Sequence, residues 1–310
     1  MLQLKTCGQQ SRNPITLIES NLRGHGGRRM NRVLFGPAGY PSEARGNVRR
    51  VFQILAEAGV DALEYAAVHG LKTKEDKAKI IGELAKESGI TMSMHAAYYI
   101  SLASKTPRIR ETSKERLVKA LRFAPLMNVK RIVFHPGYLG GLSKEEAHTV
   151  IRDALRSVWE TAGDQGEGAF LAPEIAGKLS AYGSIEQIIS LCQDVEGCIP
   201  TIDWAHLYAR SQGEVNDKQN YLKILTQFED ALGELFVNNM HFHISGITFT
   251  EKGEAAHRPL GQEWGPDILP LVEIIRECGY KPTFISESTN PLQGALYAKF
   301  LFEELEKGSK

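Results

Sequence analysis

Residues 131–137 read RIVFHPG: a run of strand length and β-rich composition ends in a histidine, followed by proline and glycine. The same arrangement, a short run that closes on a residue able to bind a metal ion, recurs along the chain. The residues that close these runs are His95, His135, Glu174, Asp203, His243 and Glu287. If each run is a parallel strand, the carboxyl ends of the strands meet at one rim. The pattern therefore predicts a metal centre at the rim of a closed βα barrel.

Apolar runs of strand length alternate with segments of helical period from Arg32 onward, the pattern of a parallel sheet covered by helices. Predicted helices include residues 48–59, 76–88 and 113–127. Eight strands are predicted, beginning near Val33, Ala62, Thr91, Arg131, Ala169, Ile199, Met240 and Thr283. The segment from Gly246 to Asp267 has no regular period, and long loops at such a rim usually carry chemistry. We expect an α/β protein of one domain, a (β/α)8 TIM barrel over residues 30–310.

Helix boundaries carry their own signals. Glycines at 59, 89 and 279 stand where helices are predicted to end, and a left-handed residue is often needed there. A capping box, in which a Ser or Thr side chain and a residue three positions later satisfy each other's backbone N–H groups, marks a helix start. Candidate boxes pair Thr112 with Glu115, Ser143 with Glu146 and Ser184 with Gln187.

The composition limits the possible functions. Thirty-seven basic residues balance 37 acidic ones, so any nucleic-acid contact must be local and not a coat of bulk charge. No run reaches the roughly 20 apolar residues that a membrane span needs. Four cysteines show no CxxC spacing, which favours a reducing, cytoplasmic location. No dinucleotide, P-loop, HExxH or GxSxG motif occurs, so we expect no nucleotide cofactor.

Residues 1–29 are rich in Gly, Arg, Asn and Gln and have no helical or strand period. They also lack the apolar core of a secretory signal. We expect a disordered extension, and His25 within it is not counted as a ligand.

Each candidate ligand has a simpler explanation when it is taken alone. A histidine at a strand end is more often a hydrogen-bonded structural residue, and a glutamate there commonly pairs with a helix. His206, three residues after Asp203, could be a surface residue beside an Asp helix cap, and His257 could be an exposed loop residue. Taken together, charged groups at inward rim positions are costly to bury without a cation. His241 and His243 share one strand face, and His243 is preferred because it lies nearer the rim.

Seven segments carry a resemblance to a known family over about residues 31–305: HAAYY (95–99), VFHPG (133–137), PEIAG (173–177), TIDWAH (201–206), HISG (243–246), HRPLG (257–261) and SESTNP (286–291). They resemble the strand-end motifs of the endonuclease IV family of apurinic/apyrimidinic endonucleases, within the xylose-isomerase-like barrels. The resemblance implies three zinc ions, with manganese as the alternative metal, and a hydrolase that cuts duplex DNA 5′ to an abasic site in DNA repair. A monomer is expected.

The resemblance also implies a role for each motif residue. His95 and His135 would hold the first zinc, and Glu174 would bridge it to the second. Asp203, His243 and Glu287 would complete the second site, and His206 with His257 would hold the third. Glu174 and Glu287 would be the catalytic carboxylates. The residues expected to contact DNA are Tyr98, Tyr99, Lys72 and Arg258.

Two departures from the family stand out. The family usually has an aspartate two residues before the histidine of the long loop, and this chain has Ala255. Glu254 or a rearrangement using His241 could replace it, so the third metal site is the least certain. The loop HGLKTKEDK (69–77) lacks the family's arginine wedge. Both tyrosines could instead pack beneath their loop. Glu64 is a candidate to orient a ligand imidazole from outside the first ring of ligands, and His69 could play a similar part at the rim.

The main rival function is a sugar isomerase or epimerase of the same superfamily. Such enzymes resemble this chain in holding a single divalent ion with a Glu, Asp, His, Glu quartet, here Glu174, Asp203, His243 and Glu287. A single-metal site does not need further imidazoles, so His95, His135 and His257 favour the endonuclease. A barrel without activity that serves as a binding protein is the third hypothesis.

Overall fold

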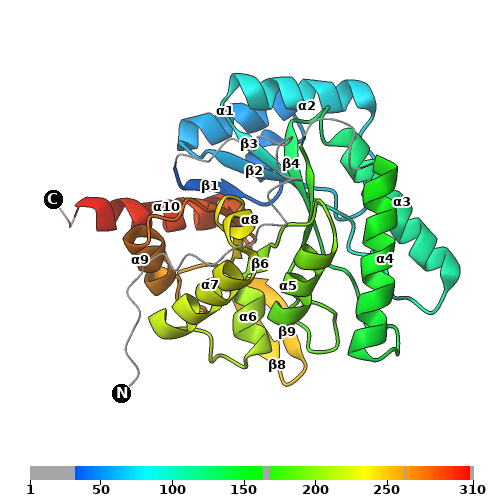
Figure 1. Ribbon diagram of the computed structural model, residues 1–310. Helices are drawn as coiled ribbons and strands as arrows, with labels where there is room; N and C mark the ends of the chain where they lie inside the picture. Colours follow the sequence, from blue (N-terminus) through cyan, green and yellow to red (C-terminus); the bar gives the residue numbers. More distant parts are fainter. Residues whose placement is uncertain (1–31, 163–167, 262, 308–310) are drawn as a thin grey trace, which may run out of the picture.

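Eight parallel strands form the centre of the computed structural model, which describes residues 32–162, 168–261 and 263–307 (Figure 1). Residues 1–29, the predicted extension, lie outside the described residues. The parallel strands are β1 (Leu34–Pro37), β2 (Ala62–Ala66), β3 (Thr91–His95), β4 (Val129–Phe134), β5 (Phe170–Pro173), β6 (Ile202–Asp203), β7 (His241–Ile244) and β10 (Thr283–Ser286).

The strands close into a barrel made of two halves. One half is a sheet of order β1-β10-β7-β6, and the other is a sheet of order β2-β3-β4-β5. Isolated parallel bridges join the halves at two seams. One bridge, Ala38 with Glu64, joins β1 to β2, and two bridges, Glu174 with Thr201 and Leu171 with Cys198, join β5 to β6. β6 is short because Pro200 has no N–H to donate to a ladder. The predicted (β/α)8 barrel is confirmed.

Helices enclose the strands, with α1 and α2 along the top of Figure 1 and α9 and α10 on its left. Their bounds, with those of the 3-10 turn η1, are η1 Ser42–Ala44, α1 Val48–Ala58, α2 Glu75–Glu87, α3 Pro107–Phe123, α4 Lys144–Ala162, α5 Ile185–Asp194, α6 Trp204–Arg210, α7 Lys218–Leu232, α8 Glu234–Val237, α9 Leu269–Glu277 and α10 Pro291–Lys307. In α1, Val51, Phe52 and Leu55 share the buried face, as the predicted period requires.

One predicted helix start is wrong. The α3 helix begins at Pro107, not at residue 113, so Thr112 lies inside it and cannot cap it with Glu115. Proline at the first position of a helix is itself a start signal, because its missing N–H has no partner to lose there. The other two boxes are confirmed: Ser143 with Glu146 and Ser184 with Gln187 exchange reciprocal hydrogen bonds.

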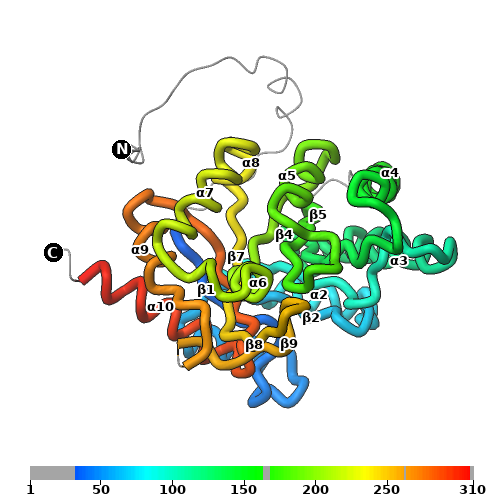
Figure 2. The backbone as a smooth tube through the Cα atoms, turned by 90° about the horizontal axis from the view of Figure 1, so that it is seen from below, coloured from blue at the N-terminus to red at the C-terminus, as the bar shows by residue number. Residues whose placement is uncertain are grey.

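The prediction of an irregular segment from Gly246 to Asp267 is wrong for its first half. Residues 246–258 form an antiparallel hairpin, β8 (Gly246–Thr250) and β9 (Gly253–Arg258). Gly253 makes the turn possible with a φ of 97°, a value that side-chain-bearing residues rarely adopt. The hairpin lies beside α6 in both views (Figure 1 and Figure 2).

The interior of the barrel is polar directly below the rim. Apolar clusters fill part of it, one of Leu34, Ala62 and Ile285 and one of Val133, Ala172 and Ile199. Branched aliphatic side chains usually dominate such interiors. Here buried polar groups also occupy inward positions, namely Glu64, Ser93, Arg131, Thr201 and His241. No helix among the described residues is long and apolar enough to cross a membrane.

Candidate metal centre

Three predicted ligands from neighbouring strand ends meet around one carboxylate oxygen. His95 ends β3, His135 follows β4 and Glu174 follows β5. The Nε2 atoms of His95 and His135 lie 3.2 and 3.4 Å from Oε2 of Glu174. One donor atom from each of the three residues lies within 4.8 Å of the others. This group has the ligand types and the spacing for one metal ion.

A second group of ligand type lies on the other side of Glu174. Donor atoms of Glu174, Asp203, His243 and Glu287 lie within 4.8 Å of one another. Nδ1 of His243 is 3.1 Å from Oε1 of Glu174 and 3.4 Å from Oε1 of Glu287. Glu174 thus presents Oε2 to the first group and Oε1 to the second, the arrangement that a bridging carboxylate needs.

Asp203 has one oxygen occupied and one free. Its Oδ1 accepts from the backbone N–H of His206 at 2.7 Å and caps α6. Its Oδ2 is buried, accepts no hydrogen bond and lies 3.4 Å from Nδ1 of His206. The helix-cap explanation considered for this residue is therefore correct for one oxygen, and the other remains available to a cation. A buried carboxylate oxygen without a partner is costly unless a cation satisfies it.

Backbone carbonyls fix the orientation of three rim imidazoles. Nδ1 of His95, His206 and His257 lies 2.9 Å from the carbonyl oxygens of Ala96, Ile175 and Glu287. A carbonyl can only accept, so Nδ1 carries a proton in each ring, and Nε2 is the nitrogen that a metal ion could bind. His243 has the opposite arrangement, because its Nδ1 faces the carboxylates. Metal-binding histidines are commonly held in this way through the nitrogen that does not bind the metal.

The carboxylates and imidazoles of the centre shift one another's pKa values. Burial lowers the pKa values of His95, His206 and His243, but the neighbouring carboxylates outweigh burial and raise them, that of His95 to about 9. Burial opposes ionisation of Glu174, but His135 and His243 hold its pKa well below the usual range. Burial, and then the charge of Glu174, raises the pKa of Glu287 despite the opposing effect of His243. Burial lowers the pKa of His135 to about 4, so its imidazole is neutral at pH 7, the form that binds metals. A bound cation would relieve the repulsion between the carboxylates.

Glu254, and not Ala255, contacts His206 beside these two groups, but among the described residues the donor atoms of Glu254, His206 and His257 do not all lie within 4.8 Å of one another. Oε2 of Glu254 lies 3.2 Å from Nε2 of His206, and the rings of His206 and His257 are 5.7 Å apart. The hairpin register shifts here: Thr248 pairs with Ala256 and Phe249 with Glu254, so Ala255 is left out of the ladder and exposed. Such a bulge changes the face to which a side chain points.

Gly177 leaves the space that Glu254 occupies. A Cβ at this position would lie 2.3 Å from Oε2 of Glu254 and 2.9 Å from Cδ2 of His206. Any side chain at residue 177 would therefore push the carboxylate of Glu254 away from the imidazole of His206.

Two of the residues expected to contact DNA, Tyr98 and Tyr99, lie in the loop after β3 and are exposed. Tyr98 and Tyr99 are 61% and 48% exposed, so they do not pack beneath their loop. The ring of Tyr98 is 5.7 Å from that of His95. The guanidinium of Arg116 lies 5.0 Å from the ring centroid of Tyr99. The hydroxyl of Tyr99 contacts Nδ1 of His69 at 3.2 Å.

The two basic residues predicted at the rim differ in their surroundings. Lys72 is exposed in the loop between β2 and α2. Arg258, at the end of β9, stacks on Trp264 with 5.1 Å between guanidinium and ring centroid. Tyr138, in the loop after β4, is 49% exposed and was not singled out from the sequence. The sequence feature that could have identified Tyr138 as a rim residue is its position directly after the motif HPG (135–137).

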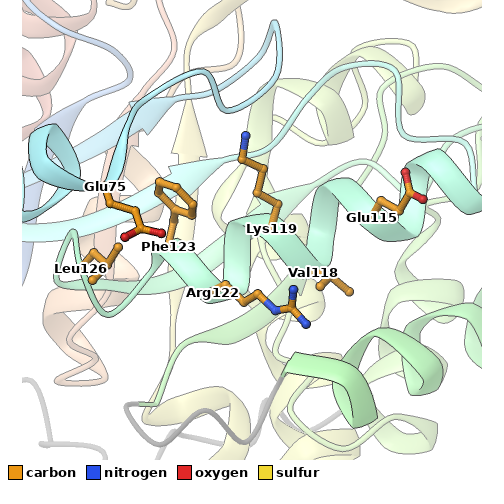
Figure 3. A pocket seen from close by; sticks show the side chains of 7 residues that line it. All are labelled: Glu75, Glu115, Val118, Lys119, Arg122, Phe123 and Leu126. Atoms are coloured by element: carbon orange, nitrogen blue, oxygen red, sulfur yellow. The ribbon is translucent and has the colours of Figure 1, made fainter.

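A hollow of 460 Å³ lies away from this centre, on the outer side of the barrel along α3 (Figure 3). It is lined by Glu75, Glu115, Val118, Lys119, Arg122, Phe123 and Leu126. None of the candidate ligands lines it, so it is not part of the candidate metal centre.

The barrel and its rim of imidazoles and carboxylates define a class of protein, and the sequence comparison gives the family. A family model described as xylose isomerase-like TIM barrel matches residues 52–303, so the chain belongs to this family. An uncharacterized protein of Methanocaldococcus jannaschii is 35% identical over 237 residues, covering 75% of this chain and 85% of that protein. A "Probable endonuclease 4" of Persephonella marina is 21% identical, covering 68% of this chain and 76% of that protein.

Solved structures share the fold at lower identity. Endonuclease IV from Thermus thermophilus superimposes with a TM-score of 0.68 at 17% identity, covering 88% of this chain and 99% of that one. The D-psicose 3-epimerase from Clostridium cellulolyticum superimposes with a TM-score of 0.65 at 14% identity, covering 88% of this chain and 99% of that one. Both functional hypotheses made from the sequence therefore have representatives with this barrel.

Proposed function

We propose that this protein is a zinc-dependent endonuclease that cleaves the DNA phosphodiester 5′ to an abasic site in base excision repair. The observation that carries the proposal is the group of His95, His135 and Glu174, with both Nε2 atoms within 3.4 Å of one carboxylate oxygen. The quartet of Glu174, Asp203, His243 and Glu287 would suffice for one ion. Because a second group shares Glu174, the two groups together could hold a bridged pair of ions. Such a pair suits a reaction in which one oxygen replaces another on a phosphate.

The donor sets suggest how ions would be distributed. His95, His135 and Glu174 would hold one ion, and the quartet would hold a second. His206, His257 and Glu254 would hold the third, with Glu254 in the role that Ala255 cannot fill. Bound zinc would supply a water of lowered pKa and positive charge for the phosphate.

The chain's own residues supply the remaining functions. Glu174 holds both groups in register because each of its oxygens faces one of them. Glu287 has a raised pKa and a side chain 16% exposed, so it can accept a proton at the entrance of the centre. Tyr98 and Tyr99 offer exposed rings for base stacking, worth about 1 to 3 kcal/mol per base. Lys72 and Arg258 provide positive charge for phosphates.

A nicking assay on a duplex with one tetrahydrofuran abasic analogue, combined with elemental analysis, tests the proposal. The protein is expected to contain more than one zinc per chain and to nick the damaged strand only. His135→Ala is expected to lose about one zinc per chain and to reduce nicking to background, because it removes one of only three donors of its group. His148→Ala is the matched control, since His148 contacts Tyr182 and Asp194 away from the centre. Equal nicking by His135→Ala and the unsubstituted protein would refute the proposal.

A single-metal sugar epimerase is the second candidate. The quartet around one ion and the structural likeness to D-psicose 3-epimerase favour it. In that case the protein would contain about one manganese or magnesium ion per chain, would convert ketoses and would not nick the duplex. His135→Ala would then leave the metal content unchanged.

A further inference from the structure

Two loops at the rim are joined to each other beside the candidate metal centre. The first connects β2 to α2 (residues 67–74), and the second connects β3 to α3 (residues 96–106). The N–H of Tyr98 in the second loop donates to the carbonyl of Val68 in the first at 3.1 Å. The hydroxyl of Tyr99 lies 3.2 Å from Nδ1 of His69. Both tyrosines that are expected to contact DNA therefore lie where the two loops meet.

The helix α3 holds the backbone of each loop. Nζ of Lys119 donates to the carbonyl of Leu71 in the first loop at 2.8 Å. The hydroxyl of Ser113, which is fully buried, accepts the N–H of Ser101 in the second loop at 3.0 Å. Because both contacts come from one helix, the position of each loop is fixed relative to α3.

Arg116 lies between these two residues on α3 and contacts Tyr99 in two ways. Its Nη1 donates to the carbonyl of Tyr99 at 3.1 Å, and the centre of its guanidinium lies 5.0 Å from the centroid of the Tyr99 ring. A planar guanidinium can stack on an aromatic ring and donate hydrogen bonds at the same time. Arg116 therefore holds both the backbone and the ring of this residue.

The two tyrosines differ in how their rings are held. The ring of Tyr99 has Arg116 against one face, and its hydroxyl contacts His69. Tyr98 is 61% exposed, and its ring lies 5.7 Å from the ring of the candidate ligand His95. Tyr98 thus offers its ring to a ligand at the metal centre, while Tyr99 is the fixed residue next to it in the chain.

We infer that Arg116 is a positioning residue: it orders the loop of residues 96–106 before DNA is bound and so holds the exposed ring of Tyr98 beside the metal centre. A loop that is already ordered loses less conformational freedom on binding, which strengthens binding. The inference rests on the proposed function for its ligand, a duplex with an abasic site. The alternative explanation is that the guanidinium of Arg116 binds a DNA phosphate directly.

Hydrogen–deuterium exchange in the protein without DNA measures the order of the loop. The amides of Tyr98 and Ser101 donate hydrogen bonds on either side of Tyr99, so their exchange reports the opening of the loop. In Arg116→Gln both amides are expected to exchange about fivefold faster, which corresponds to the loss of about one hydrogen bond. Arg122→Gln is the matched control, because Arg122 is exposed on the same helix and lines the hollow away from the metal centre. Equal exchange in the two variants would overturn the inference.

Nicking kinetics on the duplex with the tetrahydrofuran analogue test the consequence for the substrate. Arg116→Gln is expected to raise KM about tenfold, while kcat and the zinc content stay within about twofold, because the loop acts on binding and not on the metal centre. Arg122→Gln is expected to leave KM unchanged.

The salt dependence of duplex binding separates positioning from a phosphate contact. If Arg116 only orders the loop, the slope of log affinity against log salt concentration is expected to be equal in Arg116→Gln and Arg122→Gln. A slope that is smaller by about 0.9 in Arg116→Gln would assign Arg116 to a phosphate and overturn the positioning role.

These measurements also separate the inference from the proposed function. If the protein nicks no duplex, the proposed function fails, and the exchange of Tyr98 and Ser101 still decides whether Arg116 orders the loop. If the protein nicks the duplex but Arg116→Gln changes neither the exchange nor KM, the inference fails and the proposed function stands. Faster exchange with an unchanged KM would also overturn the inference, because an ordered loop would then not serve binding.

Discussion

At the scale of single residues, the exposed Ala255 and its neighbour Glu254 show how one side chain can take over the position of another. The bulge in β9 removes Ala255 from the ladder, and Glu254 reaches His206. From the sequence, Glu254 and His241 were both possible replacements for the family's aspartate. The structure places His241 below the rim, in contact with Glu64. A bulge depends on the pairing of two strands, so the sequence of β9 alone could not distinguish them.

Glu254→Gln is therefore expected to lose about one zinc per chain, because the amide is a poorer ligand than the carboxylate. Adding Ala255→Asp to this variant is expected not to restore the ion, since residue 255 is exposed and left out of the ladder. Elemental analysis of the single and double variants provides the measurement. Recovery of the zinc in the double variant would mean that the register of β9 differs from the one described.

Gly177→Ala makes the same test from the other side of the contact. The added methyl group would lie 2.3 Å from Oε2 of Glu254, so the carboxylate must move and the third ion is expected to bind more weakly. Ala255→Ser, which changes an exposed residue, is the matched control. Equal zinc content in the two variants would contradict the close packing of Gly177 against Glu254.

At the scale of elements, the sequence predicted a capping box correctly wherever it also located the first turn of the helix. Ser143 begins α4 in a reciprocal pair with Glu146: the Ser143 N–H donates to the carboxylate at 2.9 Å, and the Glu146 N–H donates to the Ser143 hydroxyl at 3.2 Å. These hydrogen bonds hold the pKa of Glu146 below its ordinary value. A carboxyl with a lower pKa in the folded state stabilises the protein above its unfolded pKa and loses this effect as the pH falls through its folded pKa.

The melting temperature of Glu146→Gln is therefore expected to lie below that of the unsubstituted protein at pH 7. The difference should shrink as the pH falls below about 4, where the carboxyl of the unfolded chain protonates first and that of the folded chain follows. Glu145→Gln, which removes the adjacent carboxylate of the same turn, is the matched control. Scanning calorimetry over this pH range provides the measurement. A difference that grows as the pH falls would contradict the sign of the shift.

The strands were predicted more accurately than the loops, and for a physical reason. Each barrel strand buries both faces, so its apolar run is marked in the sequence, and the starts at Ala62, Thr91 and Thr283 are those of the structure. The hairpin of residues 246–258 was missed because β9, with the sequence GEAAHR, buries little and shows no alternation. The contact of Glu64 with His243 joins β2 to β7, and no local pattern encodes the distance between them.

At the scale of the whole molecule, the two halves of the barrel divide the candidate ligands. His95, His135 and Glu174 belong to the half β2-β3-β4-β5, and Asp203, His243 and Glu287 belong to the other half. Among the described residues, backbone hydrogen bonds cross both seams: two join β1 to β2, from Asp61 to Phe35 and from Gly39 to Glu64, and four join β5 to the segment that leads into and follows β6. Ions held between Glu174 and the opposite quartet members would therefore join the halves across the seam between β5 and β6.

Zinc removal is expected to destabilise the whole barrel and not only the rim. An ion at a thousand times its dissociation constant contributes about 4 kcal/mol to the free energy of unfolding, which corresponds to several degrees in the melting temperature. Calorimetry with and without a chelator measures the effect, and magnesium at the same concentration serves as the control. An unchanged melting temperature would mean that the ions do not tie the two halves together.

The position of Glu174 between the two halves of the barrel has a consequence for the life of the protein in a cell. If bound ions stabilise the folded chain, its lifetime depends on the supply of those ions. Zinc starvation would then lower the free energy of unfolding and expose the chain to proteases. The amount of the protein in a cell would therefore depend on the supply of zinc, whether or not its substrate is present.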